Sequence, residues 1–142
     1  MGASRAYLKQ HGRPKTPEDL YDHALVRLGE GHRQQQMERV LERYGNPSRV
    51  AFQSGSFAVR VSAICAGVGI GYVPLFVAAQ ERSLVRLELP FPETPRGAEL
   101  LLLVHADMRK NARVRAFVEH TSGAIIAQRA LFEHGEAPTR AG

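Results

Sequence analysis

Apolar residues recur along the first ninety positions with spacings that alternate between helical and strand-like. Two segments carry the three-to-four residue spacing of an amphipathic helix: Met37, Val40, Leu41 and Tyr44, then Phe57, Val61, Ile64 and Cys65. Short alternating or continuous apolar runs predict strands at residues 24–28, 49–52, 70–73 and 84–89. Because helices separate these strands, we predict an α/β fold with a mainly parallel sheet.

Prolines, glycines and small polar residues mark where the predicted helices begin and end. Residues 4–11 form a short predicted helix that stops at Gly12. Thr16 is placed to cap a second helix in which Pro17 is the first residue. Pro74 opens a further helix directly after a predicted strand.

The last third of the chain has a different pattern. Residues 100–104 are five consecutive apolar residues, which is typical of a strand covered on both faces. Asn111 can cap a final helix. The apolar face predicted for that helix is formed by Val114, Phe117, Val118, Thr121 and Ile125. A stiff connector with three prolines, at Pro90, Pro92 and Pro95, precedes this part and is the best candidate for a boundary.

Length and composition limit the class of protein. A chain of 142 residues, 44% of them apolar, can bury a core without disulfides or metals and fits one domain, or one domain and a fragment of another. Its single cysteine, Cys65, excludes a disulfide framework and a thiolate zinc site and indicates a reducing compartment. Because the first residues also lack the pattern of a secretion signal, we expect a cytoplasmic protein.

The segment from Val61 to Gln80 has no charged residue and is long enough to span a bilayer. Three glycines and Pro74 interrupt it, however. We therefore predict the end of a helix, a buried strand and a new helix in this segment, and no membrane partner.

The charge balance is basic. The net charge is +5, with 16 arginines and 3 lysines against 14 acidic residues. Such a balance is compatible with nucleic-acid binding. The arginines are spread along the whole chain, and no basic run is interleaved with aromatic residues. We favour a solvated basic surface and expect no sequence-specific DNA binding by this chain.

No set of residues has the spacing of a catalytic or metal site. The six histidines include no pair at the i, i+4 spacing of a helical metal site. His105 precedes Asp107 after an apolar run, but a solvated histidine at a strand end is the simpler interpretation. Cys65 lies on an apolar helical face, which favours an inert core residue over a nucleophile. We expect no enzyme, no catalytic residue, no bound metal and no cofactor.

The most informative local feature is a polar turn. Gln53, Ser54, Gly55 and Ser56 join a predicted strand to a predicted helix. Backbone N–H groups at the start of a helix lie at the positive end of its dipole, so this turn is suited to a carboxylate or a phosphate. In an open parallel sheet it would lie at the carboxyl ends of the strands, where ligand crevices form. Simple capping by Ser54 or Ser56 is the alternative, and the two interpretations are compatible.

Six short segments follow one another along the chain: SRAYLKQHGRPKTPEDLYDH at residues 4–23, VAFQSGS at 50–56, AGVGIGYVP at 66–74, LVRL at 84–87, LLLVHADMR at 101–109 and RVRAFV at 113–118. This series resembles the effector-binding domain of LysR-type transcriptional regulators. Each segment is short and unspecific by itself. Their common order and spacing, over residues 4–134, carry the resemblance.

The resemblance implies a fold like that of the type II periplasmic binding proteins, in which two α/β subdomains enclose a small-molecule cleft. Residues 1–95 would form a nearly complete second subdomain, residues 96–134 the returning strand and C-terminal helix of the first, and residues 135–142 a disordered tail. In this family the polar turn faces the cleft, and the segment that matches Gly69 and Ile70 lies close by. We therefore predict that a small organic effector, most simply a carboxylate, binds at Gln53, Ser54, Gly55, Ser56, Gly69 and Ile70.

The sequence also departs from the family pattern. Gly55 stands where many relatives carry a polar side chain, so the ligand class does not carry over from them. The winged helix-turn-helix and the first part of subdomain one have no counterpart here, which implies a truncated regulator without a DNA-binding domain in this chain. Residues 96–134 would then need a covering partner, and we expect a homo-oligomer or pairing with a relative.

Two other hypotheses stay open on the sequence alone. The chain could be an interaction or oligomerisation module, or a non-functional remnant of such a regulator. The first hypothesis rests on the apolar strand and helix expected within residues 96–134, which could pair with another chain.

Overall fold

The computed structural model describes residues 1–29, 36–92 and 100–135 of the chain. Its strands are β1 (Gly2–Ser4), β2 (Leu25–Leu28), β3 (Val50–Ser54), β4 (Ile70–Gly71) and β5 (Leu84–Arg86). Its α-helices are α1 (Arg5–His11), α2 (Gln36–Tyr44), α3 (Phe57–Cys65), α4 (Leu75–Ala78), α5 (Ala112–Ala127) and α6 (Arg129–His134). Short 3-10 helices lie at Glu18–Asp22, Pro47–Arg49 and Ala106–Met108. The predicted boundary between residues 95 and 96 and the tail after Gly135 lie outside the described residues.

The described strands form one mixed sheet in the order β3-β2-β4-β1-β5. β2 pairs in parallel with both β3 and β4, as the alternation of strands and helices predicts. β1 pairs antiparallel with β4 and β5, so the prediction of a mainly parallel sheet is wrong for this half. The difference comes from β1, since the three residues Gly-Ala-Ser are too few and too small to show a strand pattern.

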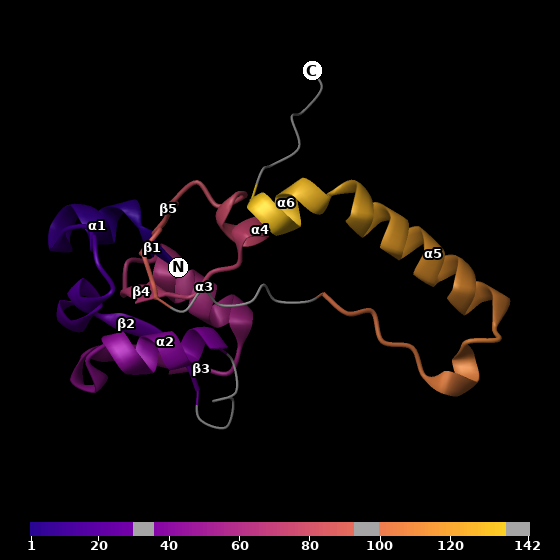
Figure 1. Cartoon of the computed structure of the whole chain (residues 1–142), viewed down its shortest axis with the longest axis horizontal. Coiled ribbons are helices and arrows are strands. Elements are labelled where there is room, and N and C mark those ends of the chain that lie inside the picture. The colour runs from indigo at the N-terminus through magenta and orange to yellow at the C-terminus, as the bar shows by residue number, and fades with distance from the viewer. Residues whose placement is uncertain (30–35, 93–99, 136–142) are drawn as a thin grey trace, which may run out of the picture.

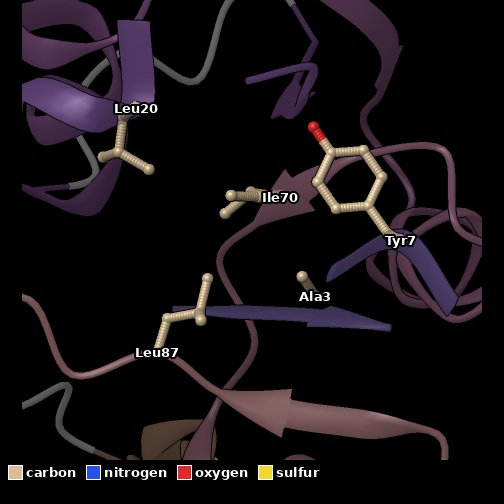
Figure 2. Packing of buried hydrophobic residues seen from close by; sticks show 5 residues of the cluster. All are labelled: Ala3, Tyr7, Leu20, Ile70 and Leu87. Carbon is tan, nitrogen blue, oxygen red and sulfur yellow. The ribbon is translucent and has the colours of Figure 1, made fainter. Parts of the chain in front are cut away.

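Each face of the sheet has its own apolar cluster, because successive strand residues point to opposite faces. The cluster on one face consists of Ala3, Tyr7, Leu20, Ile70 and Leu87, whose side chains converge in Figure 2. The cluster on the other face consists of Val26, Ile64, Val73 and Leu84. α3 supplies Ile64 to the second cluster, whereas Tyr44 at the end of α2 packs against the first. The two helices therefore cover different faces.

Several predicted helix ends are confirmed. Ser4 caps α1, since its Oγ accepts the backbone N–H of Tyr7 over 3.1 Å. The same helix ends at Gly12, whose φ of 83° is in the left-handed region that favours glycine. Asn111 caps α5 by accepting the N–H of Arg113 over 3.0 Å.

The capping role predicted for Thr16 is wrong. Its side chain caps no helix, and the 3-10 helix Glu18–Asp22 has Pro17 at its N-cap position. The carboxylate of Asp19 instead accepts the backbone N–H groups of Lys15 and Thr16, over 2.7 and 2.9 Å. The Thr16 side chain also hydrogen-bonds to this carboxylate instead of capping the helix. The two backbone bonds and this third bond hold the pKa of Asp19 below its ordinary value.

α3 buries a different face from the predicted one. Ile64 is fully buried, but Phe57 is exposed, and Val61 and Cys65 are only half-buried. The second residue of α3 in the interior is Arg60, four positions before Ile64. Because Arg60 occupies part of the inner face of α3, some of the apolar residues predicted for that face are left in contact with solvent.

The segment from Val61 to Gln80 divides as predicted into the end of α3, the buried strand β4 and the helix α4. Among the described residues, none of the helices combines the length and the apolar character needed to cross a membrane.

In the C-terminal part, residues 100–111 lead away from the sheet, the long helix α5 runs back toward the body, and α6 lies beside α4 (Figure 1). Residues 100–104 form no strand, which corrects the prediction for this run. No described strand lies beside them to supply hydrogen bonds, and Leu103 is 86% exposed. The predicted inner face of α5 is also uncovered, with Phe117 62% exposed and Val114 and Val118 half-buried.

α6 is the contact through which this part packs on the body. Leu131 is buried, and the rings of Phe132 and Phe76 lie with centroids 5.1 Å apart. A Cβ at Gly135 would be 3.3 Å from that of Leu75 in α4. The docked element is therefore α6, which the sequence pattern did not separate from α5.

Candidate functional site

A polar turn leads from β3 into α3 at the edge of the sheet. β3 ends at Ser54, level with Leu28, the last residue of β2. Ser54 Oγ accepts the N–H of Ser56 over 3.1 Å, and open space surrounds the position that a Cβ of Gly55 would take. Gln53, Gly55 and Ser56 are exposed, and Ser54 is half-buried. The turn thus lies on the surface, at the carboxyl ends of two parallel strands.

Backbone amides of the first turn of α3 face outward from this turn. Ser56 is the N-cap, and its Oγ accepts the N–H of Val59 over 3.5 Å, which is long for a hydrogen bond. The amides of Phe57 and Ala58 have no intrahelical acceptor because they belong to the first turn. They also lie at the positive end of the dipole of this nine-residue helix. Capping by Ser56 is confirmed, and it leaves amide groups with which an anion can pair.

Three charged side chains meet at the carboxyl end of β2, next to the turn. Glu38 lies in the first turn of α2 and is buried. Its Oε2 lies 3.2 Å from Nε of Arg27, and its Oε1 accepts the N–H of Leu28 over 3.1 Å. Arg60 of α3 places Nη1 3.8 Å from Glu38 Oε1. Because α2 and α3 cover different faces, the Arg60–Glu38 pair joins them across the end of β2.

The positive charges of this cluster exceed the negative charge buried with them. Arg60 is 7% exposed, and within the described ranges no group accepts a hydrogen bond from its Nε. Arg27 has a second partner, since its Nη2 lies 2.9 Å from Oε1 of Glu42, whose side chain is 41% exposed. Two guanidinium groups therefore share the buried carboxylate of Glu38, and Glu42 balances the total charge of the cluster from a more exposed position.

Gly69 and Ile70 lie at the other end of the strands. Ile70 is level with Val50, the first residue of β3, since both pair with Leu25 of β2. Ser54 is four residues further on, about 13 Å at a rise of roughly 3.3 Å per residue. Ile70 is fully buried among the apolar residues of Figure 2. The structure brings Gln53 to Ser56 together and does not bring Gly69 and Ile70 beside them.

Sequence reasoning missed residues that the structure places at the end with the turn. Arg60 and Glu38 are the charged ones, and the available signal was an arginine four residues before Ile64 on an otherwise apolar helix. Tyr72 directly follows β4 at the same carboxyl end and is half-buried, and its burial raises the pKa of its hydroxyl.

The other candidates for chemistry are apart from this turn. His105 and Asp107 form an exposed pair with Nδ1 and Oδ2 3.4 Å apart. Cys65 is a half-buried free thiol. In the part of the chain that the structure describes, no group of three or more histidine, cysteine or acidic side chains could hold a metal ion.

A mixed α/β sheet with a polar, amide-rich turn at its carboxyl edge is an arrangement of small-molecule-binding domains. The family model that matches the chain is the LysR substrate binding domain, over residues 1–124. This chain belongs to that family, whose domains have a periplasmic-binding-protein-like fold and bind small-molecule effectors of transcriptional regulators.

Two relatives are similar over most of the chain. The "Probable HTH-type transcriptional regulator LtrA" of Klebsiella pneumoniae is 31% identical over 136 residues, which cover 88% of this chain and 42% of that protein. The regulatory domain of CrgA, a LysR-type transcriptional regulator from Neisseria meningitidis, has a similar fold with a TM-score of 0.62 and 22% identity. That match covers 87% of this chain and 62% of the CrgA domain. The chain thus spans less than half the length of LtrA.

Proposed function

We propose that this chain is the small-molecule-sensing part of a LysR-type transcriptional regulator and that its effector is an anionic metabolite, most simply a carboxylate. The ligand contacts come from Gln53, Ser54, Gly55 and Ser56. Gly69 and Ile70 lie at the buried start of β4 and make no direct ligand contact in this proposal. They support the site only because β4 runs toward the same carboxyl end of the sheet as the turn. Membership of the LysR substrate-binding family supports the sensing role.

The observation that carries the proposal is the exposed turn between β3 and α3. It offers the hydroxyls of Ser54 and Ser56 and the first-turn amides of α3 at one place. A carboxylate oxygen accepts hydrogen bonds from such groups and complements the positive end of the helix dipole.

In this proposal, residues 1–95 act as the second subdomain of an effector-binding domain and residues 96–134 as the returning part of the first. The chain acts by binding its effector and catalyses no reaction. DNA contacts of this chain are then weak, indifferent to sequence and steeply dependent on salt, as expected of a general basic surface with net charge +5. Tight, site-specific DNA binding by this chain would contradict the proposal.

A panel of small carboxylic acids tests it, with the melting temperature of the chain as the first readout and calorimetric affinity as the second. At least one acid should raise the melting temperature, because a ligand that binds only the folded state stabilises it. The double variant Ser54→Ala with Ser56→Ala should then lower the affinity for that acid by about ten-fold or more, the effect of lost hydrogen bonds to a charged group.

Ser62→Ala is the matched control. This serine is also exposed and lies in α3, but its hydroxyl donates only to Ala58 O of its own helix. It should leave the affinity unchanged. A panel in which no acid binds, or in which the double variant binds as tightly as the control, would overturn the proposed site.

A second candidate function, association with another copy of this chain, is favoured by the uncovered apolar side chains of residues 100–126. The exposed ones are Leu100, Leu101, Leu102, Leu103, Met108, Phe117 and Ile126. Monomeric proteins rarely leave so many large apolar side chains together in water. Sedimentation should therefore show a concentration-dependent oligomer that Phe117→Asp dissociates, and a monomer at high concentration would rule this function out.

A further inference from the structure

Arg60 lies on the buried side of α3, near the start of this helix. Helical side chains tilt toward the N-terminus of their helix, and Arg60 follows the N-cap Ser56 by four residues, so its side chain runs back along the first turn. Its Nη1 is 3.8 Å from Glu38 Oε1, the atom that also accepts the N–H of Leu28. Because Leu28 is level with Ser54, the guanidinium lies at the same end of the sheet as the turn.

The charge of Arg60 is incompletely paired. Glu38 lies closer to Arg27, at 3.2 Å, than to Arg60, and a separation of 3.8 Å is too long for a hydrogen bond. No described residue accepts the Nε proton of Arg60, although the side chain is more than nine-tenths buried. A buried cation without hydrogen-bond partners destabilises the folded state. Glu38, which Arg27 shares, is the one carboxylate paired with Arg60 among the described residues, so an anion at the first-turn amides of α3 would complete the pairing of this charge.

We propose that Arg60 is the cationic group that makes this site specific for a small oxyanion, that is, a carboxylate, sulfate or phosphate group. This assignment rests on the proposed function and adds a residue to it. The oxyanion accepts hydrogen bonds from the first-turn amides of α3 and compensates the charge of Arg60. Turning the guanidinium toward the ligand breaks no hydrogen bond with Glu38, because that contact is longer than one.

Two opposite effects follow for the two partners of the pair. Arg60→Met keeps much of the side-chain volume and removes the charge, so it should weaken oxyanion binding by about ten-fold or more. Arg60→Lys keeps the charge and should retain most of the affinity. Glu38→Gln keeps an oxygen for the N–H of Leu28 but removes the negative charge that competes for Arg60, so it should strengthen binding.

The measurement is an NMR titration of the full chain with sodium sulfate, sodium phosphate and sodium acetate, each at constant ionic strength. The backbone amides of Gly55, Ser56 and Phe57 should shift saturably with at least one of the three. The anion that binds most tightly tells whether the site takes a planar carboxylate or a tetrahedral oxyanion. Arg39→Met is the control, because Arg39 is an exposed residue of α2 and its loss lowers the net charge by the same amount.

The outcomes separate this assignment from the proposed function. Saturable shifts in the wild type, weaker binding by Arg60→Met and tighter binding by Glu38→Gln support the role of Arg60. Equal affinity in the wild type and Arg60→Met overturns that role alone. If Arg60→Met does not fold, an unchanged or weaker affinity of Glu38→Gln overturns it. Absence of any saturable shift in the wild type overturns both the role of Arg60 and the anion site.

Discussion

The glycine at position 69 shows how one residue determines the approach of two strands. A Cβ there would collide with the carbonyl of Ala24, the residue just before β2. The same carbonyl accepts the N–H of Ile70 over 2.8 Å, so the two backbones are held together at this point. The physical requirement at Gly69 is therefore close backbone packing, which accounts for the glycine without any ligand.

We expect Gly69→Ala to lower the free energy of unfolding by about 2 kcal/mol or more, because backbone atoms must move to admit the methyl group. Gly55→Ala is the matched change, since nothing lies within 4 Å of the position that its Cβ would take. Its effect on stability should stay within about 0.5 kcal/mol. Denaturant unfolding measures both, and equal effects would refute the packing argument for Gly69.

A buried histidine and tyrosine make stability depend on pH. The N–H of Ala24 donates to the Tyr7 hydroxyl over 2.9 Å, and that hydroxyl lies 3.2 Å from Nδ1 of His23. Burial lowers the pKa of His23, and the nearby His11 lowers it further, against the opposing effect of Asp19. Neutral His23 can accept the hydroxyl proton of Tyr7, whereas the protonated ring cannot.

The sign of the pH dependence follows from that lowered pKa. The unfolded state gains a proton on His23 near its ordinary pKa of about 6.5, before the folded state does. The free energy of unfolding should therefore be highest above that pH and should fall as the pH decreases below it. His23→Gln should flatten this part of the curve, whereas His120→Gln, at an exposed position of α5, should not. An unchanged slope for His23→Gln would contradict the argument.

At the scale of elements, sequence patterns worked where a local cause was sufficient. The caps predicted at Ser56 and Asn111 are local, since a side chain bonds an amide two or three residues away. Sequence patterns fail where tertiary contacts decide the local structure. β1 exists because β4 and β5 pair with its three residues, and the Leu100–Leu103 run forms no strand because no described strand pairs with it.

The C-terminal helices differ in what they contribute to the stability of this chain. Leu131 of α6 is buried against the body, so Leu131→Ala should lower the free energy of unfolding by about 3 kcal/mol. Phe117 of α5 is mostly exposed, so Phe117→Asp should change it little at protein concentrations where the chain is monomeric. Thermal unfolding of dilute samples compares the two. A larger effect for Phe117→Asp would show that α5 is covered in the monomer.

At the scale of the whole molecule, the fold class and the location of the turn could be predicted, and the charge cluster could not. The turn is visible because small polar residues interrupt two apolar patterns at a strand–helix junction. Arg27, Glu38 and Arg60 are far apart in sequence and meet only because α2 and α3 cover different faces of β2. Likewise, the burial of Ile70 follows from its apolar strand, but its pairing with Leu25, at the opposite end of the strands from the turn, is visible in no local pattern.

The central claim is that a small anionic effector binds at the turn between β3 and α3. A crystal structure of the chain with the tightest-binding acid of the panel measures this most directly. We expect density for the acid group within hydrogen-bond distance of the amides and hydroxyls of residues 54–58. Density for the acid at any other place, with this turn unoccupied, would contradict the account.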